Sequence, residues 1–158
     1  MDNKQNLPLR LGVGIILLNK ENKVFVGRRL DNPLKFWQMP QGGIERDENL
    51  EEAAFRELNE ETSLTKSTVD ILAISKRWIK YDLPDSLIPQ LWNGSYRGQK
   101  QKWFLFKFRG PDNQININTQ TPEFSNWRWS SKEELIKSIV PFKLKVYKKV
   151  VKEFSIFL

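Results

Sequence analysis

The feature that most constrains the fold of this chain is the stretch GGIERDENLEEAAFRELNEETSL, residues 42–64. Its residues 48–62 are rich in Glu, Ala, Leu and Arg, which predicts a helix. Between Glu45 and Glu61 eight acidic residues stand against two arginines, a local charge of −6; because the formal net charge of the whole chain is +7, the rest of it carries +13. This separation of charge indicates either a solvated acidic helix or a cation site that faces a polyanion.

Length and composition predict one domain, residues 1–158, with a core large enough to fold without disulfides. The chain has no cysteine and no histidine, so a bound metal must be held by oxygen, which favours Mg²⁺, Mn²⁺ or Ca²⁺. No apolar run is long enough to span a membrane, and the first ten residues lack the apolar core of a signal peptide. We therefore expect a cytoplasmic protein without a membrane partner, and we favour a monomer.

The order of strand-like and helix-like segments predicts an α/β layered fold with a mixed sheet. Strands are expected, from apolar and aromatic content, at residues 12–18, 23–29, 70–83, 102–108 and 127–129. Beyond the acidic helix, helices are expected at residues 131–139 and from Pro141 onward. Residues 84–99 contain too many Pro, Gly and Asn for a regular element, and so long a connection in a small domain is often functional.

Three glutamates lie on one face of the acidic helix, because Glu57, Glu60 and Glu61 are spaced at i, i+3 and i+4. Like charges at this spacing destabilise a helix, so the cluster needs a compensating partner. Arg56 can pair with some of these carboxylates but not with all of them. The two glycines that begin at Gly42 allow the backbone before the helix to approach a ligand closely.

The full spacing resembles the signature of a known family. Gly42, five residues, Glu48, seven residues and then Arg56-Glu57-Leu58-x-Glu60-Glu61-x-x-Leu64 are similar to the Nudix hydrolase box. The pattern fixes many positions at once and is highly specific. One departure is Ser63, where the family usually has the glycine of a left-handed helix cap, so the geometry of this turn is open.

The resemblance implies a Nudix α/β/α sandwich with a mixed central sheet, in which the box forms a loop–helix–loop. It implies that Glu57, Glu60 and Glu61 bind a divalent metal cation, Mg²⁺ or Mn²⁺, and that Glu48 pairs with Arg56. The reaction of the family is hydrolysis of a nucleoside diphosphate linked to another group. The catalytic set implied by the box is Gly42, Glu48, Arg56, Glu57, Glu60 and Glu61.

Stretches outside the box also resemble known proteins. WQMPQGG (37–43), GQKQKWFLFKF (98–108), TPEFSNWRW (121–129) and VPFKLKVYKKVVKEF (140–154) are similar to the bacterial RNA pyrophosphohydrolases and to dinucleoside polyphosphate hydrolases. The first group removes pyrophosphate from 5′-triphosphorylated RNA and leaves a 5′-monophosphate, which initiates mRNA decay. The second splits diadenosine tetraphosphate into ATP and AMP. We expect the first activity and keep the second as the alternative.

This resemblance also implies a fourth acidic ligand and a pocket for the first base of the RNA. Glu123 becomes the ligand, although a residue of this kind taken alone is more often an ordinary loop carboxylate. Val140, Phe142 and Lys143 are placed at the base, and Arg28 is placed on its other face. An aromatic ring and a guanidinium around an unpaired base are physically reasonable.

Other residues are expected to bind substrate. Arg10, Gln41 and Gly43 are placed near the phosphates, and Tyr81 is either a second stacking surface or a core residue. Three polar residues of one strand are expected to reach phosphates from a sheet edge: Gln99, Gln101 and Lys102.

The last helix is basic, and its lysines, Lys143 among them, either face solvent or contact RNA. Two rival functions are a non-catalytic RNA-binding module and a structural Ca²⁺ site. The intact carboxylates of the box argue against the first, because a degenerate site would be free to lose groups that repel one another. The chain lacks the alternating loop ligands of an EF-hand, which argues against the second.

Overall fold

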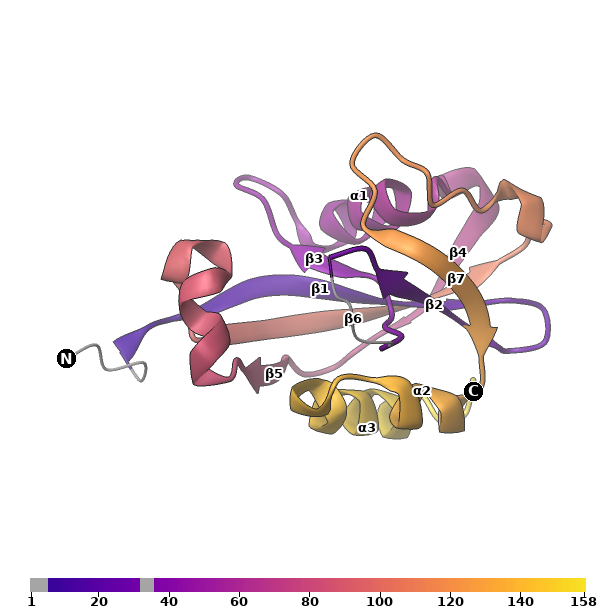
Figure 1. Cartoon of the computed structure of the whole chain (residues 1–158). Coiled ribbons are helices and arrows are strands. Elements are labelled where there is room, and N and C mark those ends of the chain that lie inside the picture. Colours follow the sequence, from indigo (N-terminus) through magenta and orange to yellow (C-terminus); the bar gives the residue numbers. More distant parts are fainter. Residues whose placement is uncertain (1–5, 32–35) are drawn as a thin grey trace.

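The computed structural model describes residues 6–31 and 36–158, and these residues are arranged around one seven-stranded sheet (Figure 1). The strands in chain order are β1 (Leu9–Leu18), β2 (Val24–Arg29), β3 (Gln41–Gly43), β4 (Val69–Ile74), β5 (Ile79–Asp82), β6 (Gly98–Phe108) and β7 (Phe124–Ser130). The sheet is mixed, because β1 and β6 run parallel from the pair Leu9–Gly98 to the pair Leu18–Lys107, whereas the other pairings are antiparallel.

The strand order is β4–β6–β1–β2–β7, with β3 beside β1 and β5 beside β6. The apolar run from Val13 to Leu18 is buried throughout. Side chains alternate between the two faces of a strand, so such a run needs cover on both faces.

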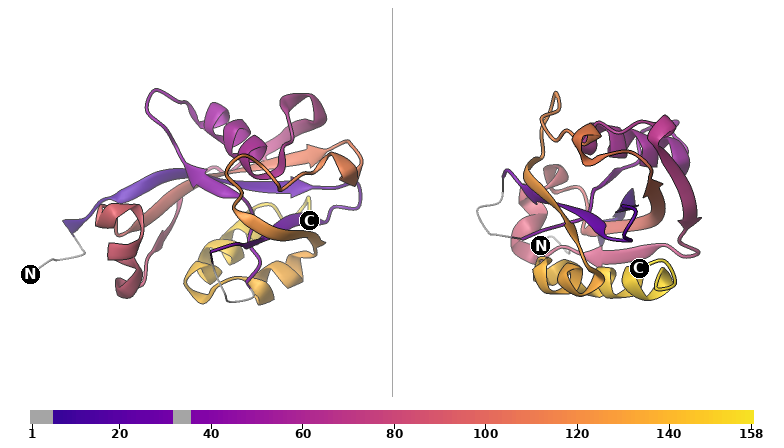
Figure 2. Two further views of the ribbon diagram at one scale, coloured as in Figure 1. Left: turned by 45° about the horizontal axis from the view of Figure 1, so that its top comes forward. Right: turned by 90° about the vertical axis from the view of Figure 1, so that its right-hand side faces the viewer.

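Helices provide that cover. The α-helices are α1 (Leu50–Thr62), α2 (Lys132–Ser138) and α3 (Leu144–Glu153), and the 3-10 helices are η2 (Lys66–Thr68), η3 (Asp85–Gln90), η4 (Trp92–Gly94), η5 (Asp112–Gln114) and η6 (Pro141–Lys143). Figures 1 and 2 show α1 on one face of the sheet and α2 with α3 on the other. The expected α/β/α sandwich with a mixed sheet is therefore confirmed.

Two apolar cores fill the space between the layers. One lies under α1, where Leu58 packs with Phe104 and Phe106 of β6. The other lies under α3, where Tyr147 meets Trp103 with ring centroids 6.0 Å apart. Neighbouring residues of β6 thus serve opposite cores, and the strand is fixed in register by packing on both sides.

The elements differ from the sequence expectation in four places. The short strand β3 was missed, because three residues, two of them glycine, give no alternation. The expected strand at 70–83 is two strands, β4 and β5, and the irregular stretch at 84–99 contains η3 and η4 and ends in the first residues of β6. The final helix begins with the 3-10 turn η6. Within the described ranges, no helix has the length and apolar character needed to cross a lipid bilayer.

Candidate functional site at the acidic helix and the sheet

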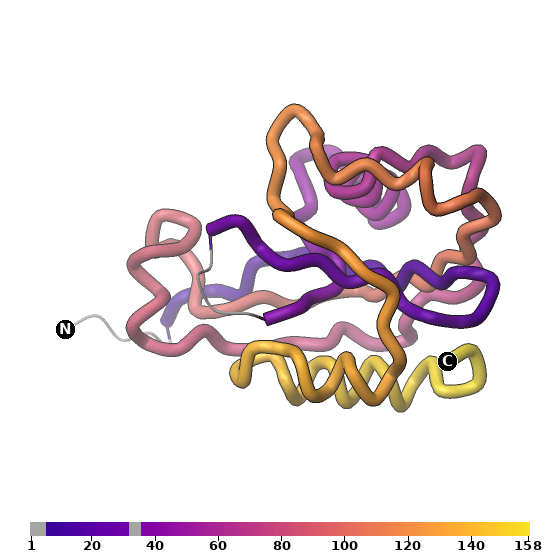
Figure 3. Tube along the Cα trace, turned by 45° about the vertical axis from the view of Figure 1, so that its right-hand side comes forward, coloured from indigo at the N-terminus to yellow at the C-terminus, as the bar shows by residue number. Residues whose placement is uncertain are grey.

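The acidic helix α1 begins with a side-chain cap and ends with a backbone cap. Asn49 accepts a hydrogen bond from the backbone N–H of Glu52 at 2.8 Å, which satisfies one of the free donors of the first turn. At the other end Ser63 has φ 70°, the left-handed conformation for which the family uses glycine. Its hydroxyl donates to the carbonyl oxygen of Asn116 at 2.7 Å, in the loop that Figure 3 shows beside α1. Serine therefore retains the turn, and the Asn116 contact offsets part of the conformational cost.

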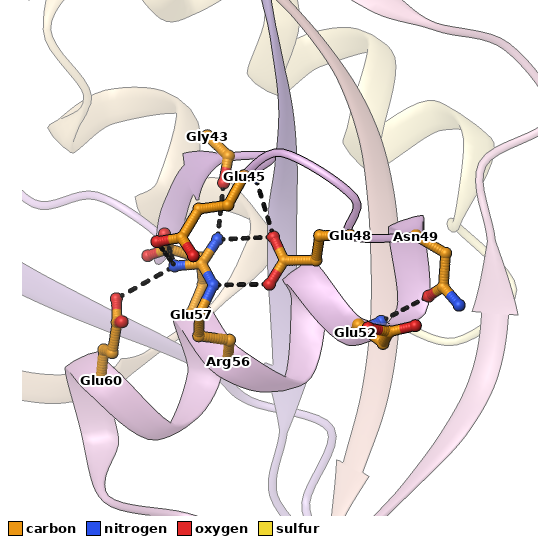
Figure 4. A network of polar contacts seen from close by, with 8 residues as sticks. All are labelled: Gly43, Glu45, Glu48, Asn49, Glu52, Arg56, Glu57 and Glu60. Carbon is orange, nitrogen blue, oxygen red and sulfur yellow. Dashed lines mark hydrogen bonds and ion pairs between the residues drawn. The ribbon is translucent and has the colours of Figure 1, made fainter.

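Arg56 joins the helix to the loop before it (Figure 4). Its Nε and Nη2 donate to the two carboxylate oxygens of Glu48 at 2.7 and 2.9 Å, and Nη2 also donates to the carbonyl oxygen of Gly43 at 2.8 Å. Its Nη1 donates to Glu57 at 2.8 Å and to Glu60 at 3.3 Å. These contacts lower the pKa of Glu48, whose carboxylate accepts the hydrogen bonds of the guanidinium.

The glycines before the helix are required by close packing. Strand β3 pairs with β1, and this places Gly42 directly under α1. A Cβ at Gly42 would overlap the carboxyl group of Glu57, and a Cβ at Gly43 would overlap the guanidinium of Arg10. The sequence predicted that these glycines let the backbone approach a ligand. In the structure they also let the backbone approach the side chains of Glu57 and Arg10.

The three clustered glutamates differ in environment. The side chain of Glu60 is 53% exposed, whereas Glu57 is 7% exposed as a residue and Glu61 only 2%. Burial raises the pKa of Glu57 to about 7 against the opposing effect of Arg56. Burial also raises the pKa of Glu61 well above its ordinary value, and the neighbouring carboxyl of Glu123 raises it further. Among the described residues, no donor reaches either carboxylate oxygen of Glu61.

Glu123 comes from outside the box. Its backbone carbonyl accepts a hydrogen bond from Leu30 at 2.8 Å, which fixes the start of β7 beside the end of β2. The residue is exposed, although the following Phe124 is 2% exposed and packs in the core under α1. Because its carboxyl raises the pKa of Glu61, the two glutamates are neighbours that come from elements distant in the sequence.

The donors of this region suit a hard divalent cation. Glu61 is a buried carboxyl with no donor among the described residues, and a cation would supply the positive charge that it lacks. In the present arrangement, no three acidic side chains of residues 6–31 and 36–158 converge closely enough to bind one ion. Arg56 draws Glu57 and Glu60 toward itself, so these two carboxylates must turn away from the guanidinium to complete such a site.

A cluster of aromatic and basic residues packs together at η6, where the pocket for a base is expected. The rings of Tyr81 and Phe142 are 5.9 Å apart, and the Nζ of Lys143 lies 5.6 Å from the Tyr81 ring and 5.9 Å from the Phe142 ring. Val140 is the residue before η6 and is half-buried. The structure thus brings four of the predicted base-binding residues together.

One expectation about this pocket needs correction. Lys143 was expected on the exposed basic helix, but it is 6% exposed and lies in η6 before α3 begins. Burial, and to a lesser extent the positive charge of Arg29, lowers the pKa of Lys143 to about 7. The guanidinium of Arg28 lies over the ring of Trp37 at 5.7 Å, a partner that sequence reasoning did not find.

A chain of buried amides connects the pocket with the loop before α1. Tyr81 donates to Gln99 at 3.2 Å, and Gln101 donates to Gln99 at 2.9 Å and to Gln41 at 3.1 Å. Gln99 and Gln101 are fully buried, and β6 has neighbours on both sides, so the expected sheet edge is wrong. Lys102 lies on the opposite face of the strand, where its Nζ donates to the carbonyl oxygens of Ser75 and Lys76.

Sequence reasoning also missed Arg29. Its guanidinium donates to both carboxylate oxygens of Asp31, at 2.8 and 2.7 Å. Burial has the largest effect on the pKa of Glu61 and on that of Lys143, and the charge of Arg29 lowers both values. Arg29 therefore acts electrostatically on both the acidic and the basic parts of the site. The sequence feature that could have indicated Arg29 is its position directly after Arg28, which was already expected at the site.

Comparison with known proteins agrees with this geometry. The family profile described as NUDIX domain matches residues 8–150. A protein named RNA pyrophosphohydrolase from Rickettsia canadensis (strain McKiel) is 54% identical over 150 residues, which are 95% of this chain and 92% of that protein. Another of that name, from Pelagibacter ubique (strain HTCC1062), is 53% identical over 149 residues, 94% of this chain and 93% of that protein.

Solved structures share the fold at lower identity. A C. elegans Ap4A hydrolase in a binary complex has a TM-score of 0.68 at 21% identity, covering 93% of this chain and 98% of that one. The E. coli dihydroneopterin triphosphate pyrophosphohydrolase has a TM-score of 0.66 at 16% identity, covering 91% of this chain and 97% of that one. The architecture, the box and these similarities together identify the chain as a member of the Nudix hydrolase family.

Proposed function

We propose that this protein is a metal-dependent RNA pyrophosphohydrolase that removes pyrophosphate from the 5′-triphosphate end of RNA and so initiates mRNA decay. The relatives support this proposal, because proteins named RNA pyrophosphohydrolase are more than half identical to this chain over nearly its whole length. The structural observation that supports it most is that the acidic residues of α1 lie near the pocket at η6. Gln41 Nε2 donates to the Tyr81 hydroxyl at 3.5 Å, and the adjacent Gly42 lies so close to α1 that a Cβ there would overlap the Glu57 carboxyl, so a base and its phosphates can be bound at neighbouring points.

The metal site would consist of Glu57, Glu60 and Glu61 from the box and Glu123 from outside it. When bound, Mg²⁺ or Mn²⁺ would neutralise phosphate oxygens and lower the pKa of a bound water. Glu57 and Glu61 are suited to this site because burial makes their ionised forms costly without a cation. Glu60, whose side chain is more exposed, would add negative charge at the solvent-facing side of the metal site.

The box residues would hold these carboxylates and take up a proton. In the reaction, water forms a bond to phosphorus, the anhydride P–O bond breaks, and the products are pyrophosphate and RNA with a 5′-monophosphate. The proton lost by the water would pass to a carboxylate oxygen of the cluster. Arg56, held by Glu48 and by the carbonyl of Gly43, would brace α1 against the loop before it, and Gly42 would leave space for the carboxyl group of Glu57.

The remaining residues would bind the RNA end. Tyr81, Phe142 and Lys143 would contact the first base, with Val140 at its rim. Arg28 would approach the base from β2. The buried amides would orient Gln41, whose side chain accepts from Gln101, toward the phosphates beside Arg10 and Gly43. Lys102 is left out of this proposal because its Nζ is engaged on the other face of the sheet.

The alternative is a diadenosine polyphosphate hydrolase that converts diadenosine tetraphosphate into ATP and AMP. The observation that keeps it open is the cluster of Tyr81 and Phe142 itself, since aromatic rings that can contact a base next to a polyphosphate suit both substrates. The two substrates differ in the groups attached beyond the first nucleoside, and no described residue so far assigned to the site distinguishes those groups.

One assay separates the two functions. Release of pyrophosphate from 5′-triphosphorylated RNA and cleavage of diadenosine tetraphosphate are measured with the same enzyme, Mg²⁺ and salt, and kcat/KM is compared. Glu60→Gln provides the control for contaminating activity. A higher kcat/KM on RNA is expected. A higher kcat/KM on diadenosine tetraphosphate would make the alternative the better proposal.

A further inference from the structure

The segment between β5 and β6 lies at one end of the sheet, beside the start of β1 (Figures 1 and 2). It contains η3 and η4 and is closed by backbone hydrogen bonds from Leu83 to the carbonyl of Arg97 and from Arg97 to that of Pro8, at 2.8 and 3.1 Å. The box does not include this segment, and no role in the proposed reaction has been given to it.

The backbone of η4 is unusual. Trp92, Asn93 and Gly94 have φ values of 49°, 58° and 70°, three consecutive residues in the left-handed region. A bulky side chain rarely adopts this conformation, and such strain persists where the surrounding structure enforces it. Hydrogen bonds from Gly94 to Leu91 and from Ser95 to Trp92 fix the turn. The Trp92 ring is also held edge-on by Tyr96, with centroids 6.1 Å apart.

The strained turn places the Trp92 ring against Arg10 of β1. The guanidinium carbon of Arg10 lies 4.9 Å from the ring centroid. The same guanidinium lies so close to Gly43 that a Cβ there would overlap it. Burial raises the pKa of Tyr81, and the charge of Arg10 opposes that rise. Arg10 is therefore held between the loop before α1 and the pocket at η6.

Among the described residues, the charge of Arg10 has no acidic partner. Arg56 pairs with carboxylates of the box, and Arg29 pairs with Asp31. Within the described part of the chain, Arg10 forms no ion pair and its guanidinium donates no hydrogen bond. An aromatic ring can hold a guanidinium by cation–π attraction without using its N–H donors, which remain available for phosphate oxygens.

We propose that Trp92 is a positioning residue that holds the Arg10 guanidinium ready to bind a phosphate of the substrate. This inference rests on the proposed function, and it assigns the segment from Leu83 to Gly98 a part in binding the polyphosphate. The contact is made before substrate arrives, so it lowers the conformational cost of binding rather than the barrier of the chemical step. Loss of the ring should accordingly raise KM and leave kcat nearly unchanged.

The test compares substitutions that separate the π face from apolar bulk. Trp92→Phe retains an aromatic face, Trp92→Leu retains apolar volume only, and Arg10→Ala removes the charge. Trp78→Leu is the matched control, because Trp78 also lies under a cation, with Lys100 Nζ 5.4 Å from its ring, but it is on the far side of the sheet from the pocket. Binding of inorganic triphosphate without metal is measured by calorimetry, and KM and kcat are measured on 5′-triphosphorylated RNA.

We expect Arg10→Ala to weaken triphosphate binding and to raise KM by about tenfold, and Trp92→Leu to do so by about three- to tenfold. Trp92→Phe and Trp78→Leu should stay within about twofold of wild type. In the Arg10→Ala background, Trp92→Leu should have no further effect, because the two side chains act as one unit.

Any of three results would overturn the inference. Trp92→Leu could leave KM and triphosphate binding unchanged, or the effects of Trp92→Leu and Arg10→Ala on KM could multiply in the double variant. The third is that Trp92→Phe binds triphosphate as weakly as Trp92→Leu. A wild-type enzyme that does not cleave triphosphorylated RNA would defeat the proposed function instead. In that case the metal-free binding series still decides whether Trp92 positions Arg10.

Discussion

Lys143 offers a prediction that depends on one buried charge. Its Nζ lies among the rings of Tyr81 and Phe142, and burial lowers its pKa from 10.5 to about 7. Arg29 lowers this pKa further, whereas the carboxyl groups of Glu61, Asp31 and Glu123 raise it. Replacing Lys143 by methionine retains an unbranched apolar stem and removes the charge.

The expected magnitude can be worked out from the two pKa values. The unfolded chain holds the lysine proton up to about pH 10.5, and the folded protein releases it above about pH 7. The lysine therefore opposes folding fully below pH 7, and this opposition fades as the pH rises. Each unit of pKa difference corresponds to about 1.4 kcal/mol, so between about pH 7 and 9.5 the free energy of unfolding of the wild type should gain up to about 3 kcal/mol from this group.

Urea unfolding of wild type, Lys143→Met and Lys148→Met at several pH values, with a chelator present, measures this directly. Lys148 is an exposed residue of α3 and serves as the control. The stability advantage of Lys143→Met over wild type should be largest below pH 7 and should shrink by about 3 kcal/mol between pH 7 and pH 9.5. An advantage that does not change with pH, or the same trend in Lys148→Met, would refute the assignment of a buried, neutralised lysine.

Three further predictions concern the acidic site. Glu60→Gln should lower activity by at least about a hundredfold at saturating Mg²⁺. It should change the free energy of unfolding by less than about 1 kcal/mol, because the ion pair of Glu60 with Arg56 is half-exposed. Retained activity would show that Glu60 is not a metal ligand. Glu123→Ala should raise the Mg²⁺ concentration needed for half-maximal activity, while RNA binding without metal stays intact. An unchanged dependence of activity on Mg²⁺ would show that Glu123 is an ordinary loop carboxylate and not a metal ligand. Gly42→Ala should displace the Glu57 carboxyl and reduce both activity and the rise of Tm on adding Mn²⁺, whereas a normal metal response would contradict the required close approach.

Local geometry explains which parts of the site could be predicted. A helix places residues i, i+3 and i+4 on one face wherever it lies, so the shared face of Glu57, Glu60 and Glu61 was predictable from spacing alone. Their different burial was not, because it depends on how the sheet and the start of β7 cover each side chain. The left-handed turn at Ser63 was open for a related reason, since the hydroxyl that supports it bonds to a residue far along the chain.

Pairings between distant segments explain the errors. Gln99 and Gln101 read as residues of an edge strand, because nothing near them in the sequence reveals that β1 and β5 flank β6. Lys143 read as the first lysine of a basic helix, but a 3-10 turn before α3 directs it inward. The contact between Trp92 and Arg10 could not be predicted from the sequence. It requires three consecutive residues in the left-handed conformation, and the sequence WNG allows this conformation but does not require it.

The parallel pairing of β1 with β6 has a consequence for biosynthesis. The first bonded pair, Leu9 with Gly98, joins residues 89 positions apart, and loop closure over that distance slows folding. While the ribosome still holds residues beyond β5, the strand with the run VGIILL has no partner on its β6 side and exposes apolar surface and free backbone groups. We therefore expect the nascent chain to depend on chaperones until Phe108 has emerged.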